Sequence, residues 1–261
     1  MSAGPLAGRR ILVTRPREQA AGLAALIREA GGEPILFPAI EIGDLADPSA
    51  FHALADRLEA FDLAIFISPT AVQRAIDLLQ AHRKGRPWPA RLQVAAIGRG
   101  TARELERRGF PEVLAPAGDA DSEALLAVPA LASVAGRQVV VFRGQGGREL
   151  LGDTLAARGA RVEYAECYRR IRPAQQISAS PPAWAQRALD AVTVSSSEGL
   201  ANLDALLGAW RRDWLQESPL FVPHPRVAEE AARLGARKTV VAGPGDREIA
   251  LGLVAYFRDA K

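Results

Sequence analysis

The chain has very few of the residues that build disulfide frameworks and metal centres. Only one of its 261 residues is a cysteine, Cys167, which excludes a disulfide framework and a cysteine metal site. The three histidines, His52, His82 and His224, lie far apart in the sequence and show no metal-ligand spacing. We therefore expect a protein without a metal.

Long apolar runs and basic stripes are also missing. No run approaches the length of a membrane span, and the start of the chain lacks a charged-then-apolar signal segment. No continuous basic stripe with interleaved aromatic residues is present, which argues against a nucleic-acid partner. These absences predict a soluble, cytoplasmic protein that contacts neither membranes nor nucleic acids.

The formal net charge of +3 is carried almost entirely by arginine, since the only lysines are Lys84, Lys238 and Lys261. Codon bias is the simpler explanation of this composition. The functional explanation is an anionic ligand, because guanidinium groups bind carboxylates and phosphates bidentately.

Complete cofactor and catalytic motifs are absent as well. The glycines of Gly98-Arg99-Gly100 and of Gly144-Gln145-Gly146-Gly147 lack the third glycine of a dinucleotide loop, and no phosphate-binding P-loop exists. The chain has no G-x-S-x-G elbow and no H-E-x-x-H motif. We expect no cofactor, and an enzyme of this kind holds its substrate more than it attacks it.

The sequence does contain an internal repeat. Gly8–Arg15 (GRRILVTR) returns 128 residues later as Gly136–Arg143 (GRQVVVFR), and Asp62–Pro69 matches Asp190–Ser197 at the same offset. Ala102–Gly109 matches Ala228–Gly235 at an offset of 126. Short apolar runs resemble one another by chance, but an ordered set with nearly equal offsets indicates two diverged copies of one unit.

Each copy alternates short apolar runs with helical patterns. This alternation predicts an α/β fold of two similar lobes, each a parallel sheet flanked by helices. The run Pro34–Ile42 is extended but contains two prolines, so it suits an edge strand or a connecting ribbon and not a central strand. Its counterpart in the second copy is Arg161–Pro173.

Small or polar residues follow the ends of the predicted strands, each just before a helix. In parallel sheets ligands bind beyond the carboxyl ends of the strands, and helix N-termini attract anions there. Capping alone also requires such residues, so each loop taken singly is explained by local structure. Together they form a candidate anion site. Its residues are Thr14, Arg15, Ser68, Pro69, Thr70, Gly98, Arg99, Thr101, Arg143, Gly144, Arg148, Ser195, Ser196, Ser197, His224 and Arg226.

Several of these segments resemble uroporphyrinogen-III synthases over nearly the whole chain. The resemblance is carried by the repeat and by an ordered set of loose motifs. These are ILVTRP at Ile11–Pro16, FISPTAV at Phe66–Val72, AIGRGTA at Ala96–Ala102, FRGQGGRELL at Phe142–Leu151 and VPHPRVA at Val222–Ala228.

The resemblance implies a flavodoxin-like wiring in which the chain crosses between the lobes twice. One lobe is then expected from 1–35 with 172–261 and the other from 42–162, joined by a two-stranded ribbon of 36–41 and 163–171. Two tandem lobes with a boundary near Ser133 are the alternative.

The family reaction implied is the cyclisation of hydroxymethylbilane, a linear tetrapyrrole polycarboxylate, with loss of water and inversion of the last ring. Unaided, the substrate closes without inversion, so the enzyme must orient it, an effect that supplies roughly 7–11 kcal/mol. Tyr168 matches the family's tyrosine on the returning ribbon, and a phenol of ordinary pKa can donate a proton at neutral pH. Packing between the lobes is an equally acceptable role for Tyr168.

Thr101, Ser68 and Ser196 match family positions near the substrate, whereas Arg226-Val227 stands where some relatives have paired threonines. The resemblance implies a monomer without a cofactor that makes transient contact with the preceding pathway enzyme. Two rivals remain open. One is a non-catalytic bilobed binding protein for a small anionic ligand, and the other is a two-domain nucleotide-sugar transferase, for which no complete diphosphate loop is visible.

Overall fold

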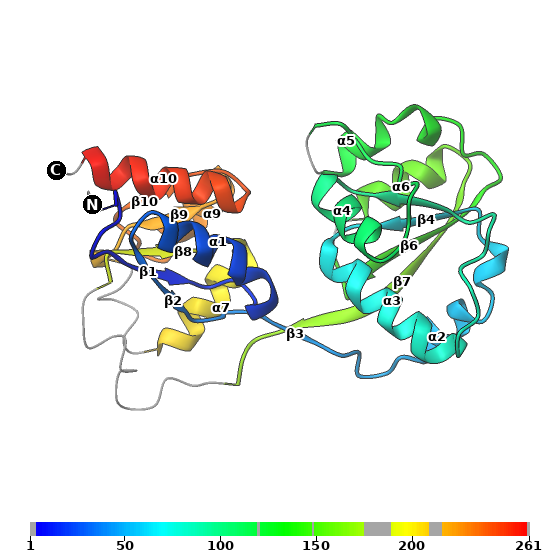
Figure 1. Ribbon diagram of the computed structural model, residues 1–261, viewed down its shortest axis with the longest axis horizontal. Helices are drawn as coiled ribbons and strands as arrows, with labels where there is room; N and C mark the ends of the chain where they lie inside the picture. The colour runs from blue at the N-terminus through cyan, green and yellow to red at the C-terminus, as the bar shows by residue number, and fades with distance from the viewer. Residues whose placement is uncertain (1–3, 119–120, 148, 175–188, 209–215, 260–261) are drawn as a thin grey trace. The chain divides into compact units, whose positions relative to one another are not determined.

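The structure is a computed structural model that describes residues 4–118, 121–147, 149–174, 189–208 and 216–259 (Figure 1). It divides into two compact units. The first unit combines Met1–Ile42 with Ile171–Lys261, and the second is Gly43–Arg170. The first unit is therefore built from both ends of the chain and the second from its middle.

The first unit contains a five-stranded sheet with the order β10-β9-β8-β1-β2, in which all neighbouring strands are parallel. The strands are β1 (Arg10–Val13), β2 (Glu33–Leu36), β8 (Ala191–Thr193), β9 (Leu220–Val222) and β10 (Thr239–Val241). The helices are α1 (Arg17–Glu29), α7 (Ser197–Leu207), α9 (Pro225–Arg233) and α10 (Asp246–Asp259).

Helices cover both faces of this sheet. Leu23 of α1 and Leu253 of α10 pack with Ile11 and Phe221 on one face. Leu203 of α7 and Val227 of α9 pack with strand residues on the other face. Burial of the sheet on both sides explains why its strands read as continuous apolar runs.

The second unit has a sheet of the order β3-β7-β6-β4-β5, with parallel pairing from β7 through β5. Its strands are β3 (Glu41–Gly43), β4 (Leu63–Phe66), β5 (Gln93–Ala96), β6 (Gln138–Gly144) and β7 (Arg161–Ile171). Its helices are α2 (Ser49–Ala55), α3 (Pro69–Arg83), α4 (Arg99–Arg107), α5 (Ser122–Leu126) and α6 (Leu150–Ala157), with 3-10 turns at Leu58–Ala60 and Pro129–Leu131.

The sheet of the second unit is also covered by helices. Leu125 of α5 and Leu155 of α6 pack against Ile65 and Val141 in one core. Phe51 of α2 packs against Phe142 of β6, with ring centroids 6.2 Å apart. The predicted fold class, two similar parallel sheets flanked by helices, is confirmed (Figure 1).

The internal repeat is visible in the strand register. Leu12 of β1 pairs with Val192 of β8, and Val140 of β6 pairs with Ala64 of β4. A shift of 128 residues converts each member of one pair into a member of the other. The first copy supplies β1 and β2 to the first unit and β4 and β5 to the second, while the second copy does the reverse. The tandem alternative with a boundary near Ser133 is therefore wrong.

The proline-bearing ribbon lies at an edge, as predicted. Pro34 belongs to β2, which is the edge strand of its sheet. Proline has no backbone N–H, and an edge strand tolerates this because one of its sides has no neighbouring strand to bond. The chain then continues into β3, which neighbours β7 in the other sheet.

Two helices differ from what the sequence pattern predicts. Ser68 followed by Pro69 predicts a helix start, and the pattern after it predicts a helix through Leu79. The helix in fact continues to Arg83, because the buried Arg83 side chain pairs with Glu59 and Lys84 ends the helix in the left-handed region at φ 48°. The pattern of residues 48–60 predicts one helix, which is split into α2 and a 3-10 turn. The Ser- and Pro-rich segment 177–184, for which the sequence predicts a loop, lies outside the described residues.

Among the described residues, no helix is both long enough and apolar enough to cross a membrane.

Candidate active site

The predicted site residues gather at the carboxyl edges of the two sheets. In the first unit Thr14 and Arg15 follow β1, Ser195–Ser197 follow β8 and His224–Arg226 follow β9. In the second unit Ser68–Thr70 follow β4, Gly98–Thr101 follow β5, and Arg143 and Gly144 end β6. Parallel pairing places each group along one edge. Arg148 lies outside the described residues.

Two serines of these edges cap helices in the same way. Ser68 has φ −165° and ψ 159°, and its Oγ accepts the N–H of Ala71 at 3.0 Å. Ser196 has φ −164° and ψ 160°, and its Oγ accepts the N–H of Gly199 at 3.0 Å. Each cap contributes about 1 kcal/mol. Both serines therefore have a structural task, and they occupy equivalent places in the two copies.

Two of the predicted threonines, Thr14 and Thr101, are buried. The Thr14 hydroxyl donates to the Thr193 carbonyl at 2.8 Å, and Thr193 in turn donates to the Leu12 carbonyl at 3.0 Å. Thr101 is buried on α4. The Thr14 hydroxyl is therefore engaged in joining β1 to β8, and Thr101 is covered by its own unit.

The predicted arginines fall into two groups. Arg15 is paired with Asp246 at the start of α10, and Arg143 is buried. Arg99 at the start of α4 and Arg226 in the first turn of α9 are exposed. His224 is also exposed, at the N-cap of α9. Of the arginines predicted for the site, Arg99 and Arg226 are therefore the ones whose guanidinium groups are exposed to solvent.

The buried Arg143 side chain contacts both the following turn and a tyrosine of β7. Its guanidinium donates to the carbonyls of Gly144 and Gly146, and it lies 4.6 Å from the ring centroid of Tyr164. Burial raises the pKa of Tyr164 above its usual range, and the nearby Arg143 charge partly opposes that shift. The sequence correctly placed Arg143 at the edge but not its inward orientation.

A register shift between β6 and β7 decides where Tyr168 lies. Arg143 is opposite Glu166, whereas the next residue, Gly144, is opposite Tyr168, so Cys167 is the extra residue of a bulge. The Cys167 thiol donates to the Arg143 carbonyl at 3.2 Å, and burial raises its pKa to about 12. Bulges of this kind re-aim neighbouring side chains. Here the bulge directs Tyr168 over Gly144.

Tyr168 is 2% exposed and lies at the carboxyl edge of the second sheet. Its hydroxyl lies 3.5 Å from the Ser68 Oγ, and its carbonyl accepts the N–H of Gln145 at 2.7 Å. A methyl group on Gly144 would come within 2.6 Å of the Tyr168 ring, so only glycine allows this seat. The structure thus brings Tyr168, Ser68 and Gly144 together.

A cavity of about 380 Å³ opens beside this cluster, lined by Arg143, Gly144, Gly147 and Tyr164 among others. Its volume is within the range of ligand pockets.

Comparison with known proteins identifies the family. Residues 21–245 match the model of the family described as uroporphyrinogen-III synthase HemD. The chain belongs to the uroporphyrinogen-III synthase family. The resemblance inferred from the sequence motifs is therefore confirmed, and the chain is a lyase of porphyrin biosynthesis.

Relatives match the chain over most of its length. The uroporphyrinogen-III synthase of Escherichia coli strain K12 is 37% identical over 245 residues, covering 92% of this chain and 98% of that protein. A putative uroporphyrinogen-III synthase of Methanothermobacter thermautotrophicus is 29% identical and covers 78% of this chain and 80% of its own length.

Solved structures of the family share the fold. A mutant uroporphyrinogen III synthase from the extremely thermophilic bacterium Thermus thermophilus has a TM-score of 0.60 at 20% identity, covering 97% of this chain and 100% of that one. The Helicobacter pylori 26695 enzyme has a TM-score of 0.60 at 16% identity, covering 96% of this chain and 99% of that one. These likenesses concern the fold alone.

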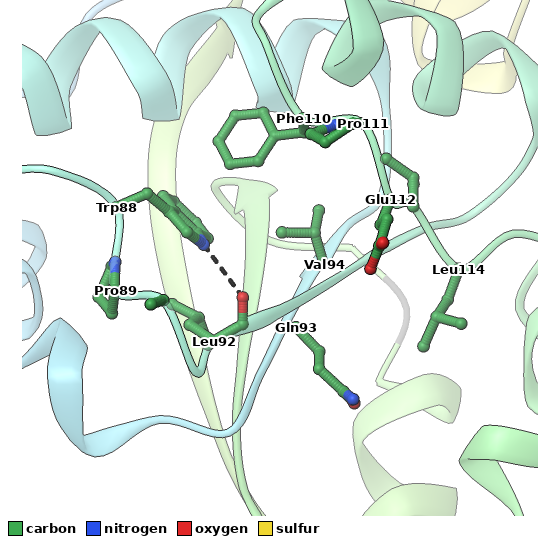
Figure 2. A pocket seen from close by; sticks show the side chains of 11 residues that line it. Trp88, Pro89, Leu92, Gln93, Val94, Phe110, Pro111, Glu112 and Leu114 are labelled. Carbon is green, nitrogen blue, oxygen red and sulfur yellow. Dashed lines mark hydrogen bonds between the residues drawn. The ribbon is translucent and has the colours of Figure 1, made fainter.

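Another cavity lies away from the residues that the family resemblance suggested. It measures about 590 Å³ and borders β5, between Trp88 and the segment Phe110–Leu114 (Figure 2). The Trp88 Nε1 donates to the Leu92 carbonyl at 3.1 Å, and Trp88 meets Phe110 edge to face. Its charged lining residue is Glu112, which makes this cavity unsuited to a polycarboxylate.

Sequence reasoning missed Tyr164 and Glu166. The Glu166 Oε1 accepts the N–H of Gly146 at 3.0 Å. Both residues alternate along the regular part of β7, before the bulge at Cys167. This spacing was a usable signal, because every second residue of a strand points to the same face.

Proposed function

We propose that this protein cyclises hydroxymethylbilane with inversion of the last pyrrole ring and loss of water, using Tyr168 as the proton donor. The carrying observation is the Tyr168 hydroxyl, which lies 3.5 Å from Ser68 and against Gly144 at the carboxyl edge of the second sheet. Family membership supports this reaction over the non-catalytic binding protein and the nucleotide-sugar transferase.

The proposed first step is proton donation from the Tyr168 hydroxyl to the terminal hydroxyl of the substrate. The carbon–oxygen bond then breaks, water leaves, and the terminal carbon becomes a cation. The substituted carbon of the last ring attacks this cation and forms a spiro centre. The bond from that carbon to the preceding methylene bridge then breaks, and the bridge carbon, now a cation, is attacked by the unsubstituted α-carbon of the same ring. Loss of the proton from that α-carbon restores the aromatic ring and balances the proton first donated, and the ring is now inverted. General acid catalysis of this type contributes about 10²–10⁴-fold.

Orientation of the substrate supplies the rest of the effect. The exposed Arg99 and Arg226, with the capped N-termini of α3 and α7, are our proposed partners for its carboxylates. Charge-assisted hydrogen bonds of this kind are worth about 1.5–3 kcal/mol each. Arg226 offers a guanidinium where some relatives are expected to have hydroxyl groups, so the contacts on this side differ in kind.

The protein is further proposed to act in the cytoplasm as a monomer, without a cofactor, and to receive its substrate through transient contact with the preceding pathway enzyme. The overall arginine-derived positive charge of +3 supports uptake of a polyanionic substrate.

An isomer-resolved assay tests the proposed reaction. Purified protein is mixed with freshly prepared hydroxymethylbilane, and the oxidised products are separated by chromatography. We expect mainly the type III isomer. A product that is type I alone, as in the enzyme-free control, would overturn the proposal.

A further inference from the structure

The turn beside Tyr168 has little intrinsic order. Three of its four residues, Gly144–Gly147, are glycines, and Gly146 and Gly147 adopt φ values of 72° and 109°. Glycine gains access to this region at a high cost in conformational entropy. A turn of this composition needs outside contacts to keep one conformation.

Two side chains hold Gly146 at both of its backbone groups. The Glu166 carboxylate accepts the Gly146 N–H at 3.0 Å, and the Arg143 guanidinium donates to the Gly146 carbonyl. A methyl group on Gly147 would lie 2.8 Å from the Arg143 Nη2, so the guanidinium packs directly on the turn. The turn is therefore fixed by one residue from each of the neighbouring strands β6 and β7.

The same turn supports Tyr168. Gly144 lies under the Tyr168 ring, where an added methyl group would be 2.7 Å from Cζ and 3.0 Å from the hydroxyl oxygen. The Gln145 N–H donates to the Tyr168 carbonyl at 2.7 Å. Any movement of the turn therefore moves the surface against which the phenol rests.

A carboxylate is an unexpected neighbour of a site for a polycarboxylate, because like charges repel. Glu166 is half-buried at this edge, and its presence is explained if its carboxylate holds the turn in place. We propose that Glu166 is a positioning residue for Tyr168, whose carboxylate holds the Gly146 N–H and so fixes the Gly144–Gly147 turn beneath the phenol. The inference rests on the proposed function for its catalytic consequence, whereas the hold on the turn is independent of it.

Two conservative substitutions of Glu166 separate the length of its side chain from its negative charge. Glu166→Gln keeps an oxygen at the same distance and removes the charge, while Glu166→Asp keeps the charge and withdraws the oxygen by one methylene group. We expect Glu166→Gln to keep kcat within about twofold. We expect Glu166→Asp to lower kcat about tenfold with little change in KM, because one positioning hydrogen bond is lost.

The matched controls are Glu163→Gln and Glu163→Asp. Glu163 lies three positions earlier on β7 and pairs with Arg57, with 2.8 Å between Arg57 Nη1 and Glu163 Oε1. These controls change the same charge on the same strand, and we expect both to keep wild-type kcat. Thermal unfolding of all four variants shows whether each is folded.

Amide hydrogen exchange of Gly146 gives a readout that does not depend on activity. We expect slow exchange in the wild type and in Glu166→Gln, and exchange about tenfold faster in Glu166→Asp. In Glu166→Asp the share of type I product should also rise, because unassisted closure competes with the slower enzyme.

Equal kcat and equal Gly146 exchange in Glu166→Asp and the wild type would overturn the inference. So would a Glu166→Gln variant as impaired as Glu166→Asp, because the charge and not the hydrogen bond would then matter. A wild-type protein that forms only the type I isomer overturns the proposed function instead, and Gly146 exchange still decides whether Glu166 holds the turn.

Discussion

Arginine side chains at the two sheet edges serve different purposes. Arg143 is buried in β6 and donates to backbone carbonyls of the turn that follows, and Arg15 pairs with Asp246, so both stabilise the chain around the sheet edge. Arg99 and Arg226 are exposed and suit a carboxylate ligand. Planar, permanently charged guanidinium groups fit both tasks, since they form several directed hydrogen bonds at once.

At this scale the first prediction concerns the Tyr168 hydroxyl. Tyr168→Phe should lower kcat by about 10²-fold, with little change in KM, because the ring stays seated on Gly144 while the proton donor is lost. Steady-state kinetics with isomer analysis measures the effect. Tyr256→Phe is the control, since Tyr256 packs against Phe221 in the first unit. An unchanged kcat in Tyr168→Phe would remove its role as an acid.

The second prediction concerns an exposed guanidinium. Arg99→Gln should raise KM about tenfold, because one charge-assisted hydrogen bond to a substrate carboxylate is lost. The control is Arg103→Gln, which removes another exposed arginine one turn further along α4. Initial rates over a range of substrate concentrations decide the matter, and equal KM values in the two variants would exclude Arg99 as a binding residue.

Among the elements, the pair β6 and β7 does most to shape the site. Their register shift opposes Gly144 to Tyr168, and Cys167 in the bulge is tied to the Arg143 carbonyl. The register of β6 and β7 therefore sets the position of the Tyr168 phenol. The glycine turn at the end of β6 holds Tyr168 in that position.

Close packing of these two strands yields a third prediction. Gly144→Ala should displace the Tyr168 ring and lower kcat, while destabilising the fold by about 1–3 kcal/mol through overpacking. Gly252→Ala is a matched control, because its added methyl group would lie 2.8 Å from the Ala242 Cβ in the first unit. We expect similar losses in urea unfolding but a loss of kcat only in Gly144→Ala. A fully active Gly144→Ala enzyme would contradict the assigned seat of Tyr168.

The paired helix caps give a fourth prediction. Ser68→Ala and Ser196→Ala should each lower the free energy of unfolding by about 1 kcal/mol, because each removes an equivalent 3.0 Å hydrogen bond at a helix start. Urea unfolding measures both losses. Since Ser68 also faces the Tyr168 hydroxyl, Ser68→Ala should reduce kcat, but by a smaller factor than Tyr168→Phe. The reverse order would shift the main role to Ser68.

On the scale of the whole molecule, each sheet is completed by strands from both copies of the repeat. Strand β1 lies between β2 of its own copy and β8 of the other, and β4 lies between β5 and β6 in the same manner. Neither copy contains a complete sheet, so the two copies depend on one another for folding.

This exchange leads to a fifth prediction about fragments. Residues 43–170 contain β4, β5, β6 and β7 to Arg170, and this fragment should fold with a cooperative thermal transition. Residues 1–133 contain about one copy but lack β6 and β8, which leaves two central strands without a neighbour, and this fragment should not fold. Circular dichroism on both fragments tests the contrast, and a cooperative transition in 1–133 would refute it.

Local and periodic features of the sequence were sufficient to determine several properties. The repeat offset predicted two similar α/β units, the prolines of Pro34–Ile42 predicted an edge segment, and Ser68-Pro69 predicted a helix start. The motifs indicated the family, which the comparisons confirm. These features are readable because strand, helix and cap preferences depend on residues close together in the chain.

Only the tertiary structure decided which side chains turn inward and which meet at the edge. The bulge between β6 and β7, the inward orientation of Arg143 and the bond from Glu166 to Gly146 depend on a register between strands about 20 residues apart. A sequence pattern shows which residues of a strand share a face, but it does not show the register in which the strand pairs with its neighbour. The seat of Tyr168 therefore follows from the pairing of two strands, which no single stretch of the chain contains.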